Sequence, residues 1–133
     1  MTVTTPPAEA EDVEVLAFEE QLLTAAAAPR EQAAIRALVD EEQILARDAF
    51  HRALVRHNPD GMEVSWQNLA CYLYGLGLND AERSFVDLVL SIASPHQTSL
   101  TRVMDLDERR LAIVLRAMIN LAGVDTLAVG TRL

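Results

Sequence analysis

The stretch from Asp105 to Gly123 constrains the fold more than any other, because it carries signals for both ends of a helix and an apolar middle. Asp105 and Glu108 have the spacing of a reciprocal cap at a helix N-terminus, and Gly123 is the residue type that most often follows a helix end. Between them, apolar residues recur at three- and four-residue spacing over a broad face: Leu111, Ile113, Val114, Leu115, Met118, Ile119, Leu121 and Ala122. A helix this apolar needs neighbours on several sides, so we predict that residues 105–122 form the central helix of the fold.

Other segments predict the helices that would surround it. Apolar spacing indicates one helix over residues 9–28 and a long one over residues 30–57, which ends at the turn sequence Asn-Pro-Asp-Gly. Three further helices are expected to begin at the capping residues Ser65, Asn79 and Ser94. The predicted fold class is therefore all-α, a single compact bundle of about five or six helices.

The length and composition favour one domain. A chain of 133 residues can bury a continuous core. Residues 1–8 contain two prolines and are expected to be a flexible lead-in, so residues 9–133 would form the single helical domain. The one cysteine, Cys71, excludes an internal disulfide and fits a cytoplasmic protein, in which we expect it to be a small buried hydrophobe. No secretory signal or membrane-spanning segment is evident.

The charge argues against direct binding to nucleic acid. The chain has 20 acids and 11 bases, a formal net charge of −9, and every base is arginine. Affinity for a phosphate backbone comes from clustered basic residues that release counterions. Residues 1–63 hold 13 of the acids and 5 of the arginines, so the acidic excess lies in the N-terminal half.

Asp48 and His51 are the residues that best resemble a metal site. An acid three residues before a histidine on a helix is the unit with which helical bundles hold iron or manganese. Such a site needs two of these pairs, and neither His57 nor His96 has an acid three residues before it. A metal- or small-ligand-binding bundle is therefore the alternative interpretation, and the leading one involves no cofactor.

The leading hypothesis is a non-enzymatic protein that binds another protein or a second copy of itself. Two sets of residues are the candidates for contact. Carboxylates on the first two helices could steer a basic partner: Glu14, Glu19, Glu20, Glu41 and Glu42. Tyr72 and Tyr74 are aromatic residues of the kind that anchor interfaces, and at least one of them should be exposed. A structural subunit whose C-terminal tail docks on a neighbour is a third possibility.

Overall fold

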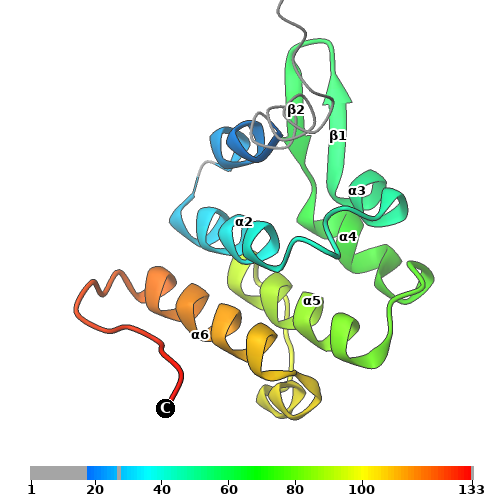
Figure 1. Cartoon of the computed structure of the whole chain (residues 1–133). Coiled ribbons are helices and arrows are strands. Elements are labelled where there is room, and N and C mark those ends of the chain that lie inside the picture. The colour runs from blue at the N-terminus through cyan, green and yellow to red at the C-terminus, as the bar shows by residue number, and fades with distance from the viewer. Residues whose placement is uncertain (1–17, 27, 133) are drawn as a thin grey trace, which may run out of the picture.

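The computed structural model describes residues 18–26 and 28–132, and it is mostly helical (Figure 1). Residues 18–25 are helical. The elements that follow are α2 (Pro29–Glu41), α3 (Asp48–Leu54), β1 (Val55–Asn58), β2 (Gly61–Val64), α4 (Trp66–Tyr72), the 3₁₀ helix η1 (Leu73–Gly75), α5 (Asp80–Ala93), the 3₁₀ helix η2 (Leu100–Asp105) and α6 (Glu108–Ala122). The predicted helical class is confirmed. The predicted lead-in, residues 1–8, lies outside the described residues.

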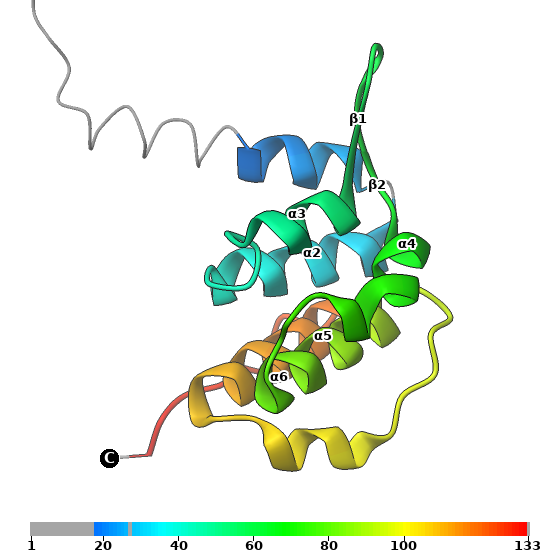
Figure 2. The same ribbon diagram turned by 90° about the vertical axis from the view of Figure 1, so that its right-hand side faces the viewer.

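The centre of the fold is α5, so the prediction that residues 105–122 form the central helix is wrong. Ten of the fourteen residues of α5 are buried, and α5 packs against α2, α4, α6 and η2 (Figure 2). In contrast, α6 buries only Ile113, Val114 and Ala117. Its apolar residues cover a wide face, but its main neighbours, α2 and α5, cover only part of that face.

Only the C-terminus of α6 agrees with the sequence prediction. Gly123 adopts the left-handed conformation, with φ of 72°, and its N–H donates to the carbonyl of Asn120. The N-terminal cap is Asp107 and not Asp105. Asp105 ends η2 instead, and its carboxylate accepts a hydrogen bond from the Ser84 hydroxyl at 2.7 Å.

The long helix predicted over residues 30–57 is divided in three. α2 ends at Glu41, and Glu42 has a positive φ of 70°. The Glu41 carboxylate accepts a hydrogen bond from the backbone N–H of Ile44 at 2.9 Å, which replaces the partner that a continuing helix would supply. After α3 the chain enters an antiparallel hairpin, in which Val55 pairs with Val64. The turn predicted at residues 58–61 is confirmed as the end of this hairpin, but the strands were not predicted.

The capping predictions for the remaining helices are confirmed at two positions out of three. The side chains of Ser65 and Asn79 accept hydrogen bonds at the N-termini of α4 and α5. Ser94 follows the end of α5 instead, and the next helical turn, η2, begins at Leu100. Within the described part of the chain, no helix is both long and apolar enough to cross a membrane.

Candidate functional site

Four of the five acids predicted as one interaction surface lie among the described residues, and they differ in exposure. Glu41 is fully buried, so its assignment to an exposed acidic face is wrong. Glu20 is exposed at a hollow between the first described helix and the hairpin, whereas Glu42 is exposed beyond the end of α2. Glu19 is partly buried, and Glu14 lies outside the described residues.

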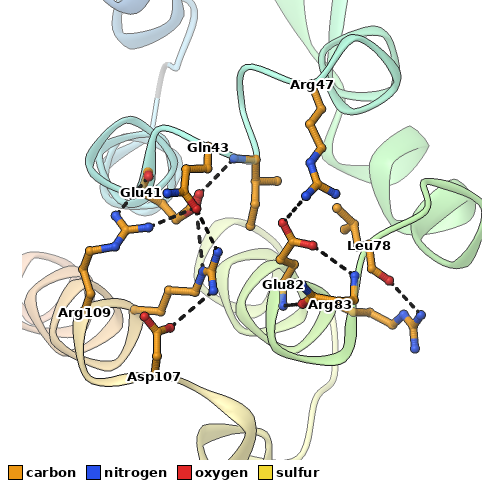
Figure 3. A network of polar contacts seen from close by, with 11 residues as sticks. Glu41, Gln43, Arg47, Leu78, Glu82, Arg83, Asp107 and Arg109 are labelled. Atoms are coloured by element: carbon orange, nitrogen blue, oxygen red, sulfur yellow. Dashed lines mark hydrogen bonds and ion pairs between the residues drawn. The ribbon is translucent and has the colours of Figure 1, made fainter.

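Glu41 joins the end of α2 to the start of α6 (Figure 3). Its Oε2 atom lies 3.7 Å from Nη2 of Arg109 and 3.8 Å from Nε of Arg110. Arg109 also donates to the backbone carbonyl of Glu41 at 3.0 Å. Arg110 has further partners in Asp107, at 3.4 Å, and in Gln43, at 3.3 Å. A buried carboxylate needs such partners, so the role of this cluster is to hold the two helices together.

A second acid with a structural role, Glu82, lies at the start of α5. One of its oxygens accepts from the backbone N–H of Asn79 at 3.1 Å, and the other lies 2.5 Å from Nη2 of Arg47 (Figure 3). At the other end of α5, the Arg30 guanidinium donates to the carbonyls of Ser91, Ile92 and Ser94, at 3.2, 3.0 and 2.8 Å. Arg30 therefore satisfies the carbonyls that the end of a helix leaves without partners.

Asp87 organises the segment between α5 and η2, which the sequence did not reveal. Its Oδ1 lies 2.7 Å from Nε2 of His96, and its Oδ2 accepts a hydrogen bond from Thr98 and lies 3.5 Å from Nε of Arg102. The histidine and the threonine both bind the carboxylate, so this arrangement holds a loop against α5 rather than activating the hydroxyl through the histidine.

The proposed metal residues Asp48 and His51 lie near each other. The His51 ring stacks on Phe18, with centroids 4.8 Å apart, and lies 5.9 Å from the ring of His57. Burial and the neighbouring His57 lower the pKa of His51, and Asp48 acts in the opposite direction. Within residues 18–26 and 28–132, no group of three histidine, cysteine or acidic side chains has the arrangement of a metal site.

Tyr72 and Tyr74 are both exposed, so the expectation that at least one of them is exposed is confirmed. The Arg83 guanidinium lies over the Tyr74 ring, 5.1 Å from its centroid. The neighbouring Cys71 is also exposed, so the expectation that it is buried is wrong.

The largest gathering of exposed apolar side chains is on and around α6. Of the nine large hydrophobic residues exposed in the described part of the chain, seven lie between residues 100 and 127. Six of these border two neighbouring grooves, and we call them the α6 surface: Leu100, Leu115, Met118, Leu121, Val124 and Leu127. Figure 1 shows α6 at the edge of the fold, and among the described elements its main neighbours are α2 and α5.

Met118 lines both grooves, each of about 270 Å³. The first groove lies between α6, α5 and η2, with Leu100 and Leu121 among its walls. The second lies between α6 and the C-terminal tail, with Leu127 on its far side, and all of its lining side chains are apolar. The tail is held against α6 by a 3.5 Å hydrogen bond from Arg116 to the carbonyl of Val129. The α6 surface thus has a shape that can receive apolar side chains.

Comparison with known proteins adds no assignment. No protein-family model matches the chain, and no curated protein or solved structure is significantly similar to it. The observations that bear on function are therefore those of the fold and its surfaces.

Proposed function

We propose that this chain is a non-enzymatic, cytoplasmic protein that acts by binding another protein through the α6 surface. The observation that carries the proposal is the concentration of exposed large apolar side chains around α6. Leu115, Met118 and Leu121 are 39%, 46% and 42% exposed on one helix. Contiguous exposed apolar surface of this kind is a frequent property of interaction sites.

This proposal keeps the predicted class of function and moves the contact to a different surface. A contact surface made of acids would need a row of exposed carboxylates, and Glu41 is buried in the interior of the fold. The α6 surface consists of apolar side chains, so affinity there would come from burial of apolar area, at about 25 cal/mol per Å² removed from water. The alternative of a metal- or ligand-binding bundle has support only from the proximity of Asp48 and His51.

Site-specific photo-crosslinking in the native host tests the proposal. A photoreactive phenylalanine analogue replaces Leu115 in the second groove, and irradiation is followed by detection of adducts on a denaturing gel. We expect a discrete protein adduct that is lost when the same chain also carries Met118→Asp. The matched control places the analogue at Gln67, an exposed position on α4, where we expect no adduct.

Two outcomes would contradict the proposal. One is that position 115 forms no adduct at native expression level. The other is that Met118→Asp, in a chain with unchanged circular dichroism, leaves the adduct as strong as before. The mass of the adduct also shows whether the bound polypeptide is a second copy of this chain or a different protein.

A further inference from the structure

The outer side of α6 has the spacing of a helix that pairs with another helix. Leu111, Leu115, Met118 and Ala122 follow one another at intervals of four, three and four residues. This is the interval of the apolar seam in two-stranded helical packing, in which each seam residue enters a space on the facing helix. Leu115, Met118 and Ala122 are exposed and Leu111 is partly exposed. Within the described residues, Leu127 and Val129 of the C-terminal tail border the grooves along this seam and leave it open to solvent.

The positions beside the seam have no charged residues. In paired helices these positions usually carry charges that select the partner. Here they are Ala112, Val114, Ile119 and Leu121, of which Val114 is already buried within the fold. A partner rich in charge gains nothing at these four positions, and an identical helix meets no like charge at them. The nearest acid along the same spacing is Glu108, three residues before Leu111, at the start of α6.

The distribution of charge also favours a second copy at this surface. Residues 100–132 hold four acids and five arginines, whereas the rest of the chain holds sixteen acids and six arginines. Two copies that approach through α6 therefore bring together the part of each chain in which acids and arginines nearly balance, so the net repulsion between them is small. At physiological salt, repulsion is strongly screened beyond about 8 Å.

We infer that the α6 surface binds a second copy of this chain, with the two α6 helices antiparallel. This inference rests on the proposed function and names its partner. The antiparallel arrangement opposes the two helix dipoles and separates the acids at the two helix starts, Asp107 and Glu108. A two-fold axis at the middle of the seam then places Leu115 against Met118 of the second copy, and Leu111 against Ala122. Leu111 is larger than Ala122, and Leu115 is branched whereas Met118 is flexible. Each contact therefore pairs unlike side chains.

Sedimentation equilibrium of the purified full-length protein tests the inference. We expect a monomer–dimer equilibrium for the wild type. Met118→Asp should weaken the dimer by at least about 100-fold, because an unpaired carboxylate enters the interface from each chain. The matched control is Met104→Asp, the same change at an 81% exposed methionine on η2, outside the seam, and it should leave the dimer constant unchanged.

Disulfide formation tests the antiparallel arrangement. In a Cys71→Ser background, Leu115→Cys and Met118→Cys chains are oxidised singly and as a mixture. We expect the mixture to form the 115–118 link faster than either chain links to itself. Faster links between identical positions would overturn the antiparallel arrangement.

A wild-type protein that stays monomeric up to about 1 mM, a concentration at which weak millimolar contacts become detectable, would overturn the self-association itself. The proposed function can still hold in that case, because photo-crosslinking from position 115 would then yield an adduct with a different protein. If position 115 forms no adduct and the chain is monomeric, both statements are wrong.

Discussion

Replacement of Glu41 by alanine is the most informative test of the fold, because one side chain connects three parts of it. Its carboxylate binds the backbone N–H of Ile44 in the segment after α2, and it lies within 3.8 Å of the guanidinium groups of Arg109 and Arg110 on α6. The side chain is fully buried. Loss of the carboxylate therefore leaves an amide and two cations with fewer partners.

The size of the effect follows from what each partner retains. A buried amide without an acceptor costs about 1–3 kcal/mol. Removal of one member of a fully buried ion pair costs about 3–5 kcal/mol, but here the Arg109 side chain is 44% exposed and can be solvated. Arg110 keeps Asp107 and Gln43. We therefore expect Glu41→Ala to lower the free energy of unfolding by about 3 kcal/mol. Glu41→Gln, which retains an acceptor for the amide, should lower it by about 1 kcal/mol.

Urea unfolding, followed by the fluorescence of the single, buried Trp66, measures these changes. With an m value of about 2 kcal/mol per M, the alanine variant should unfold at a urea concentration about 1.5 M lower than the wild type. The matched control is Glu42→Gln, at the exposed neighbouring acid, which should change stability by less than about 0.5 kcal/mol. An alanine variant as stable as this control would refute the assignment of Glu41 to the interior.

Two further predictions concern other parts of the fold. Arg30→Ala should destabilise the protein by about 2 kcal/mol in the same assay, because three carbonyls at the end of α5 lose their donor. The control is Arg36→Ala, at an exposed position of α2, which should have nearly the stability of the wild type. The lowered pKa of His51 predicts that acidification destabilises the fold: as pH falls through the ordinary value of 6.5, the unfolded chain takes up this proton before the folded chain does, so stability present at neutral pH is lost below it. Thermal melts between about pH 7.5 and pH 5.5 should show a smaller loss for His51→Phe, which keeps a ring against Phe18; an equal loss in both proteins would contradict this account.

Local features of the fold were predictable because they depend on neighbouring residues. The cap at Asn79 needs only Glu82 three residues later, and both hydrogen bonds of that cap are present. Gly123 ends α6 because it adopts a positive φ without a steric penalty. The turn at residues 58–61 follows from its proline and glycine in the same way.

The candidate site was less predictable, because burial of an acid depends on residues far away in the chain. Glu41 and Glu42 are adjacent and chemically identical, yet only Glu41 is buried. The difference comes from Arg109 and Arg110, more than sixty residues later, which meet one of the two carboxylates. Asp87 and His96 were missed for a similar reason, since the loop after α5 must fold back before they meet. No pattern in the local sequence carries that information.

The chain by itself predicted a helix over residues 105–122 with a wide apolar face, because helix formation and apolar spacing are properties of one segment; the structure begins this helix at Glu108. Only the tertiary structure decided which part of that face is buried. α2 and α5 cover the side with Ile113, Val114 and Ala117, and the side with Leu115 and Met118 remains exposed. The physical reason is that burial of apolar area is shared between elements, so how much of a helix is covered depends on where its neighbours pack.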